Sequence, residues 1–345
     1  MAAQEFKGSL TAAEACDAIG RGIAAEQPTW ELDVVPLADG GPGFLDAFLH
    51  STDATEETAE TVDALRRPTR ARYLRLRRTG EVIIEAAQSN GLTLIAEQER
   101  DALRAGTEGV GTLLRAALRP DTVRVMVGVG GTATSDGGTG MARSLGALLL
   151  DAEGQPLEAG VEALLGLARI VWEPGPLTGP QWLVATDVTS PLLGPRGSAA
   201  VFSPQKGATD SEVDIIERAL ERFALIVRRD LGVDLIDLPG AGAGGGLAAG
   251  IVAFLGGRIV SGFEVVEALT GLRERLRQAD LVVTGEGWFD SQTLAGKGPG
   301  RLLETARREG KPAVIFAGGA DPAAGPAITI AGIEPDRERS MTAAE

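Results

Sequence analysis

The hydrophobic pattern of the chain alternates between short apolar runs and amphipathic segments. Residues 11–26 begin with Thr11 and Glu14 at the spacing of a capping box, and Ala15, Ile19 and Ile23 follow at helical intervals. The next run, "ELDVVPL", is short and β-branched and breaks into "ADGGPG". This is typical of a strand that ends in a loop. We therefore predict a helix over residues 11–26, followed by a strand and a loop.

The same order of apolar run, glycine-rich loop and helical pattern recurs along the chain. It is found in "VRVMVGVGGTATSDGG" before "TGMARSLGALL", in "QWLVATDVTSPLLGPRG", in "ADLVVTGEGWFDSQT" before "GPGRLLETARR", and in "KPAVIFAGGAD". Apolar strands that alternate with helices predict an α/β fold with doubly wound parallel sheets. In such folds ligands bind beyond the carboxyl ends of the strands.

Two segments depart from this order. Residues 57–88 alternate with period two around a Thr-Gly turn, which predicts hairpin strands and a second domain that begins near residue 60. The segment "DSEVDIIERALERFALIVRRDLG" predicts a long amphipathic helix with a solvated charged face. Its apolar face is formed by Ile215, Ile216, Leu220, Phe223 and Val227. A length of 345 residues is also typical of two domains.

Charge and composition narrow the range of partners. A formal net charge of −15 argues against nucleic acid and against an acidic membrane surface as partners. No window approaches the length of a membrane span, and the start lacks a signal pattern. The single cysteine, Cys16, excludes a disulfide within the chain, and the single histidine, His50, excludes a histidine-rich metal site. We predict a cytoplasmic protein with a small-molecule substrate; the sequence leaves a homodimer open.

The residue types available for chemistry favour phosphoryl transfer, whose transition state needs positioning and charge neutralisation rather than a histidine. The main candidate is the loop "GVGGTATSDGG" at 128–138, because Gly130 and Gly131 allow close backbone approach to an anion and Thr132 adds a hydroxyl. Asp136 either orients a metal or substrate hydroxyl or caps the following helix. The chain contains no Walker A motif and no protein-kinase signature set.

A second glycine-rich run, "LPGAGAGGGLAAGIVAFL", contains Gly240, Gly242 and Gly245 at the spacing of the dinucleotide fingerprint. This spacing keeps open an NAD(P)-dependent oxidoreductase that acts on a small hydroxy acid. Pro239 fits poorly with a strand that leads into the loop, and no convincing ribose-binding acid follows. Close helix packing or a phosphate contact is the competing interpretation.

Three of the four lysines stand directly before a glycine, namely Lys7, Lys206 and Lys297. A single Lys-Gly pair is typical of a helix C-cap. Three such pairs in a lysine-poor chain favour local anion contacts, because a compact ammonium meets a phosphate as a point charge. Acids that could coordinate Mg²⁺ or accept a hydroxyl proton, or else form turns and caps, lie in or just after strand-like runs. These acids are Asp39, Asp187, Glu286 and Asp290.

Taken together, these loops give the chain a family resemblance. The segments "FKGSL", "PLADGG", "GVGGTATSDGG", "DVTSPLLGP", "SPQKGA", "GAGAGGGL" and "TGEGWFDSQT" run in order from about residue 4 to 330. The chain resembles the bacterial type I glycerate kinases, the glycerate 2-kinase family. The resemblance implies transfer of the ATP γ-phosphate to D-glycerate with Mg²⁺, most often giving 2-phosphoglycerate. It also implies a flavodoxin-like domain from residues 1–60 and 270–345, an inserted mixed α/β domain from 61–269, and an active site in the cleft between them.

The resemblance and the loop chemistry together assign site residues. Catalytic roles fall to Lys7, Asp187 and Asp290, and the two aspartates are also the candidate Mg²⁺ ligands. Substrate or phosphate contacts are assigned to Ser9, Asp39, Gly40, Gly41, Gly130, Gly131, Thr132, Asp136, Lys206, Glu286 and Lys297.

Several positions depart from the family pattern. Gln4-Glu5 replaces the usual Asp-Ser, Pro42 opens a changed loop, and Trp288 stands where arginine is common. These changes keep open a metabolite-binding homologue without turnover. Both ends also look short: the expected first strand has little room before Glu5, and a closing helix is missing after "AITIAGIEPD". Because a lost strand would expose backbone groups of its neighbour, we expect a longer natural chain.

Overall fold

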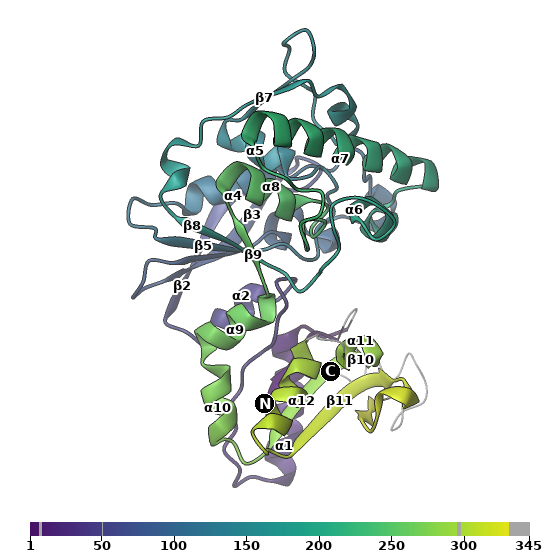
Figure 1. Cartoon of the computed structure of the whole chain (residues 1–345). Coiled ribbons are helices and arrows are strands. Elements are labelled where there is room, and N and C mark those ends of the chain that lie inside the picture. The colour runs from purple at the N-terminus through teal and green to yellow at the C-terminus, as the bar shows by residue number, and fades with distance from the viewer. Residues whose placement is uncertain (7–8, 50, 295–297, 331–345) are drawn as a thin grey trace. The chain divides into compact units, whose positions relative to one another are not determined.

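The computed structural model describes residues 1–6, 9–49, 51–294 and 298–330. Lys7, His50, Lys297 and the segment of the expected closing helix lie outside the described residues. The chain divides into two compact units, one of Met1–Asp53 with Ser261–Glu345 and one of Ala54–Val260 (Figure 1). The boundaries predicted from sequence, after residues 60 and 269, lie a few residues later in the chain than the boundaries between these two units. Each unit is described by itself.

The first unit is built on a parallel sheet in the order β1-β10-β11-β12. Its strands are β1 (Ala2–Ala3), β10 (Val282–Phe289), β11 (Ala313–Ala320) and β12 (Ile328–Thr329). Its helices are α1 (Ala12–Glu26), α2 (Phe44–Leu49), α9 (Gly262–Thr270), α10 (Leu272–Gln278), α11 (Ser291–Leu294) and α12 (Gly298–Arg308). The predicted capping box of Thr11 and Glu14 starts α1.

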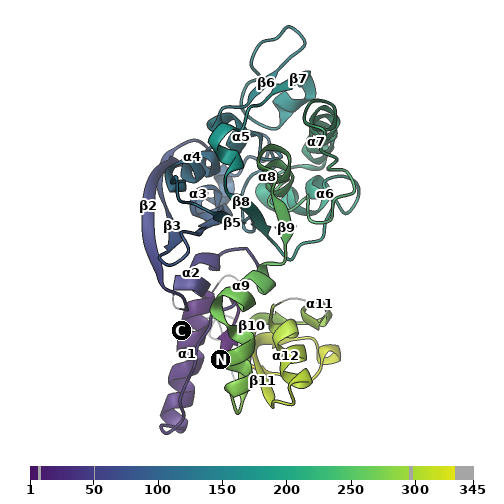
Figure 2. The same ribbon diagram turned by 60° about the vertical axis from the view of Figure 1, so that its left-hand side comes forward.

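Helices cover both faces of this sheet (Figure 2). Ala3 packs with Ala15 and Cys16 of α1, whereas the neighbouring Ala2 packs in a cluster with residues of α9, α10 and α12. Successive residues of a strand point to opposite faces, so these two alanines separate the two helical layers.

The first strand of this unit is short: β1 has two residues and pairs with β10 in parallel. One expectation about the start of this unit is wrong. The run at 31–38, predicted as a strand, is not one. Val35 and Leu37 donate N–H bonds to Met1 and Ala3 carbonyls at 2.9 and 2.8 Å, but a two-residue neighbour offers too few partners for a full ladder.

The second unit holds a mixed sheet of six strands in the order β2-β3-β4-β5-β8-β9. The strands are β2 (Ala54–Val62), β3 (Pro68–Leu76), β4 (Val82–Glu85), β5 (Arg124–Gly128), β8 (Gln181–Ala185) and β9 (Arg258–Val260). The pairs among β2, β3 and β4 are antiparallel, which confirms the predicted hairpin, and the remaining pairs are parallel. The predicted α/β class is therefore confirmed.

Six helices and a small strand pair pack around this sheet. They are α3 (Ala87–Asn90), α4 (Glu108–Ala117), α5 (Thr139–Leu145), α6 (Ser198–Phe202), α7 (Asp210–Leu231) and α8 (Leu247–Leu255), with β6 (Leu148–Leu150) and β7 (Arg169–Val171). The predicted apolar face of α7 is buried at Ile216, Leu220, Phe223 and Val227, and Ile215 is half-buried.

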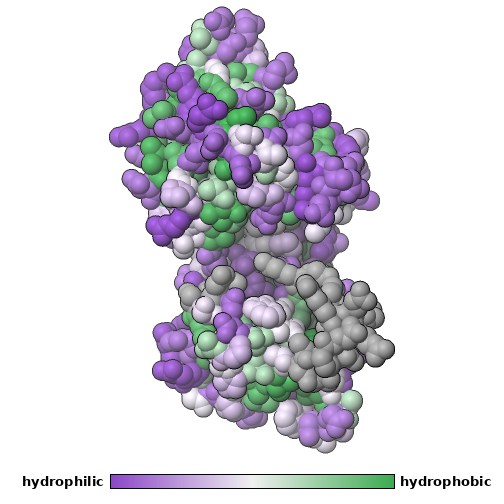
Figure 3. Space-filling view, turned by 90° about the vertical axis from the view of Figure 1, so that its right-hand side faces the viewer, coloured by the Kyte–Doolittle hydropathy of each residue, from purple (hydrophilic) through white to green (hydrophobic). Residues whose placement is uncertain are grey.

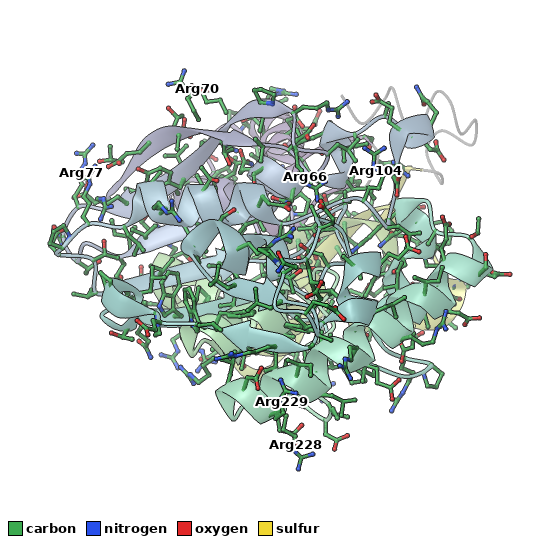
Figure 4. The ribbon with its side chains drawn as sticks, turned by 90° about the horizontal axis from the view of Figure 1, so that it is seen from above. Arg66, Arg70, Arg77, Arg104, Arg228 and Arg229 are labelled. Carbon is green, nitrogen blue, oxygen red and sulfur yellow. The ribbon has the colours of Figure 1, made fainter. Side chains whose placement is uncertain are left out.

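Several arginines lie on the surface of the second unit. Arg228 and Arg229, on the other side of α7, point outward, as do Arg70 and Arg77 (Figure 4). Hydrophilic side chains cover much of the face shown in Figure 3, with smaller hydrophobic areas between them. Within the described ranges, no helix combines the length and apolar character needed to span a membrane.

Candidate active site

Three loops of the second unit join at the carboxyl edge of its parallel strands. The 128–138 loop begins at the last residue of β5, residues 186–191 follow β8, and residues 238–246 precede α8. The Gly137 N–H donates to the Gly245 carbonyl at 3.0 Å, and the Gly242 N–H donates to the Ser190 carbonyl at 3.1 Å. These backbone bonds connect each loop to another, at the edge where α/β sheets bind ligands.

The glycine run at 240–246 packs against the 128–138 loop. A Cβ built on Gly245 would collide with the Thr134 carbonyl and lie 2.8 Å from the Ser135 Cα, and Gly245 has a φ of +70°. A Cβ at Gly246 would meet the Gly137 Cα at 2.9 Å. Backbone-to-backbone packing therefore explains these glycines, although the packing partner is the 128–138 loop and not a helix.

The dinucleotide interpretation of this run is wrong. A fingerprint loop connects a strand directly to a helix, whereas the residues before Gly240 are turns and the preceding strand, β8, ends at Ala185.

The accessible part of the 128–138 loop is its first corner. Gly130 is half-buried and Gly131 is exposed, with a φ of +71° at Gly131. The next residue, Thr132, is 4% exposed, and its hydroxyl has no hydrogen-bond partner among the described residues. The Thr134 hydroxyl is also buried and has no hydrogen-bond partner among the described residues. An exposed glycine corner beside unused hydroxyls suits an anion that approaches the backbone closely.

Asp136 is a structural anchor in the buried half of the loop. Its Oδ2 accepts bonds from the Thr107 N–H, the Thr107 hydroxyl and the Gly140 N–H, each at 2.9 Å, and its Oδ1 accepts the Gly138 N–H at 3.1 Å. Burial raises the pKa of Asp136, Glu108 adds to the rise, and the bonds from Thr107 and Gly140 oppose it. The helix-capping interpretation is thus confirmed, because Asp136 caps α5 while it ties the loop to the start of α4.

Lys206 lies beneath the same loop. Its side chain is 3% exposed, and its ammonium donates to the Thr134 carbonyl at 2.5 Å. Burial lowers the pKa of Lys206 to about 7, and the charge of Asp136 opposes this shift. Gly207, with a φ of +94°, caps the short turn Pro204–Lys206, so the C-cap interpretation holds for the glycine. The lysine itself contacts the loop backbone from the interior of the unit.

Asp187 stands at the same edge as these groups. It follows β8 and is half-buried, and the N–H of its neighbour Thr186 donates to the Val260 carbonyl of β9 at 3.0 Å. The predicted residues that the second unit collects at this edge are Gly130, Gly131, Thr132, Asp136, Asp187 and Lys206.

The first unit places a second group of predicted residues at the carboxyl edge of its own sheet. Asp39 accepts bonds from the Gln4 side-chain amide and the Gly41 N–H, both at 3.1 Å. Gly40 has a φ of +91°. Gly262, at the start of α9, packs against the Asp39 carbonyl, where a Cβ would not fit. Gln4, one of the departures from the family pattern, therefore supplies a donor that holds the Asp39 carboxylate.

Strand β10 and the residue that follows it supply two further acids of this group. Glu286 is 6% exposed within the strand, and the adjacent Gly285 carbonyl accepts the Gln4 N–H at 2.8 Å. Asp290 follows the strand and caps α11, because its Oδ1 accepts the Thr293 N–H at 3.1 Å. Ser9 is exposed, and its hydroxyl donates to the Phe6 carbonyl at 3.0 Å. The group thus comprises Ser9, Asp39, Gly40, Gly41, Glu286 and Asp290.

Sequence reasoning did not identify two residues that hold these groups in place. Thr107 binds Asp136 from 29 positions away and also accepts the Met141 N–H at 2.8 Å. Gln4 binds Asp39 from 35 positions away. Neither contact can be predicted from the residues next to it in the sequence. Thr107 stands just before a helical run, but threonine at that position usually predicts a helix cap.

Comparison with known proteins agrees with this arrangement. Residues 1–334 match the glycerate kinase family. The glycerate kinase of Halalkalibacterium halodurans is 37% identical over 92% of this chain and 84% of its own length. The glycerate 2-kinase of Escherichia coli is 36% identical over the same shares.

A solved structure has the same fold. The crystal structure from Salmonella typhimurium LT2, provisionally named glycerate kinase 2, superposes with a TM-score of 0.81 at 35% identity, and the match covers 99% of this chain and 94% of that one. The loops at the carboxyl edges therefore belong to a shared kinase architecture. The chain is a member of the glycerate kinase family and an ATP-dependent kinase.

Proposed function

We propose that this kinase transfers the γ-phosphate of ATP to the 2-hydroxyl of D-glycerate and releases 2-phosphoglycerate. The observation that carries the proposal is the corner of the 128–138 loop, where exposed glycine backbone adjoins buried, unpartnered threonine hydroxyls. Catalysis of phosphoryl transfer consists largely of positioning and charge stabilisation, which backbone N–H groups and hydroxyls can supply. The family match and the E. coli glycerate 2-kinase support the substrate and the position.

The residues take different roles in this proposal. Gly130, Gly131 and Thr132 hold an anionic group, and Asp136 and Lys206 keep their loop in shape from within. Asp187 or Asp290 accepts the proton of the substrate hydroxyl as the new phosphate bond forms. The assignments of Lys7 and Lys297 as charge-neutralising groups rest on the sequence alone.

Magnesium fits the chemistry of these acids. The described residues contain no group of three or more His, Cys, Asp or Glu side chains placed to hold a metal ion. Mg²⁺ in kinases commonly takes only one or two carboxylates, with phosphate oxygens and water completing its shell. Asp187 and Asp290 offer such carboxylates, each in the loop just after a strand. A bound Mg²⁺ would neutralise phosphate charge during transfer.

The direct test is ADP formation by the purified chain. We expect release of ADP that depends on D-glycerate and Mg²⁺, and tartronate and other small hydroxy acids are assayed beside it. Phosphorus NMR of the product should show 2-phosphoglycerate. A folded sample that forms no ADP with glycerate would refute the proposal, and 3-phosphoglycerate as product would refute its choice of hydroxyl.

A threonine variant tests the proposed anion corner. Thr132→Val keeps the shape of the side chain and removes a hydroxyl that has no partner in the described structure, so the free energy of unfolding should stay within about 0.5 kcal/mol of the wild type. We expect kcat/KM to fall about tenfold or more, because a hydrogen bond to a charged group is lost.

Thr139→Val is the matched control for this variant. The Thr139 hydroxyl donates to the Asp136 carbonyl at 2.8 Å, so its removal should cost about 1 kcal/mol of stability. Unchanged kcat/KM in Thr132→Val would remove Thr132 from the site.

A further inference from the structure

Trp288 is an exposed aromatic residue whose ring packs against Gly319 of the first unit's sheet. Its side chain is 59% exposed, and in the β10–β11 pair it lies opposite Gly319. A Cβ built on Gly319 would approach the Cε3 of the indole to 2.7 Å and collide with its six-membered ring. The missing side chain at Gly319 therefore lets the indole rest on the strand backbone while much of the ring stays open to solvent.

This indole lies among the candidate acids of the first unit. Glu286 and Trp288 are two residues apart in β10 and so share one face, and Asp290 follows the strand directly. They stand at the carboxyl end of parallel strands, where ligands of α/β sheets bind. Trp288 thus presents an aromatic surface at the candidate site itself.

The other exposed tryptophan provides an internal comparison. Among the large hydrophobic side chains exposed in the described ranges, the aromatic ones are Trp30, at 50%, and Trp288. Trp30 lies in the turn between α1 and the extended run at residues 31–38, which lies parallel beside β1. The backbone N–H of Trp30 donates to the Gln27 carbonyl at 3.0 Å. Because the run at 31–38 is parallel to β1, the turn between α1 and this run lies at the amino end of the sheet. Trp30 is therefore similarly exposed but lies at the end where ligands do not bind.

We propose that Trp288 stacks against the adenine base of the nucleotide. This inference rests on the proposed function, because ATP as phosphate donor supplies the base. An aromatic side chain binds a base by offset stacking of the two π systems. Because the indole already packs against Gly319 on one side, stacking on its open side requires little additional side-chain ordering. The departure at this position, where the family resemblance implies arginine, thus gives the chain a base contact of its own.

The test compares ligands with and without a base. ADP and inorganic tripolyphosphate are titrated by calorimetry, with Mg²⁺ and without glycerate, into the wild type, Trp288→Ala, Trp288→Phe and Trp30→Ala. We expect Trp288→Ala to weaken ADP binding about fivefold or more and to leave tripolyphosphate binding unchanged. Trp288→Phe should restore most of the affinity, and Trp30→Ala should bind ADP as the wild type does.

A second variant tests the support beneath the ring. Gly319→Ala should displace the indole and reproduce the loss of ADP affinity, with little further loss when it is combined with Trp288→Ala. The proposal is overturned if Trp288→Ala binds ADP normally, or if it loses ADP and tripolyphosphate to the same degree.

The outcome separates this inference from the proposed function. A chain that binds ADP through Trp288 but does not phosphorylate glycerate would refute the choice of substrate and uphold the base contact. A chain that phosphorylates glycerate but binds ADP equally well without Trp288 would uphold the choice of substrate and refute the base contact.

Discussion

Replacing Gly245 by alanine is expected to destabilise the second unit by about 3 kcal/mol and to abolish most kinase activity. The new Cβ would enter the space of the Thr134 carbonyl, and a φ of +70° is itself strained for alanine. Because the collision is with backbone, no side-chain rotation can relieve it. The 128–138 loop must then move, and with it the glycine corner at Gly130 and Gly131.

Gly256→Ala is the control that measures the cost of a positive φ for alanine without a collision of the new Cβ. Gly256 follows α8 with a φ of +66°, and a Cβ there meets nothing within 4 Å. Its replacement should cost only about 1 kcal/mol and leave activity close to normal. Urea unfolding followed by tryptophan fluorescence provides the measurement, in a chain whose first-unit tryptophans Trp30 and Trp288 are replaced by phenylalanine so that Trp172 and Trp182 report on the second unit. If both alanine variants lost the same stability, close packing of the glycine run would not be the reason for Gly245.

The stability of the second unit is expected to rise with pH because of Lys206. Its pKa is about 7 in the folded chain against 10.5 as the ordinary value. Between these values the unfolded state binds more protons, so the free energy of unfolding increases with pH. The cost of burying the ammonium is complete below pH 7 and falls as pH rises toward 10.5. For Lys206 alone, the gain from pH 6.5 to 8.5 is about 2 kcal/mol.

Lys206→Met should remove this pH dependence, since methionine fills a similar volume without a titrating group. We also expect a lower kcat, because the Thr134 carbonyl loses the donor that holds it at 2.5 Å. Ser203→Ala is the control: its hydroxyl lies 3.2 Å from the Ser135 hydroxyl in the same buried region, and it does not titrate. Urea unfolding at a series of pH values gives the comparison. A Lys206→Met chain that keeps the wild-type slope would show that the ammonium is not buried in solution.

Much of the fold follows from local patterns in the sequence. The capping box at Thr11 and Glu14 places the start of α1, and the periodicity at 210–231 identifies α7 and most of its buried face. Apolar runs ending in glycine predict β5 and β10, and period-two alternation predicts the hairpin of β2 and β3. These elements could be predicted because their determinants lie within a few residues of one another. The run at 31–38 could not, because a strand also needs a partner long enough to pair with it.

The roles of the site residues depend on contacts between distant parts of the chain. The sequence by itself determined the family, the α/β class and the loops that carry the candidate residues. Only the tertiary structure decided that Asp136 caps α5 and binds Thr107, that the glycine run supports the 128–138 loop, and that the Lys206 ammonium reaches Thr134 from 72 positions away. A Lys-Gly pair or a glycine run has the same local pattern whether it caps a helix, packs or binds an anion. The neighbours brought by folding decide which, because they set burial, space and hydrogen-bond partners.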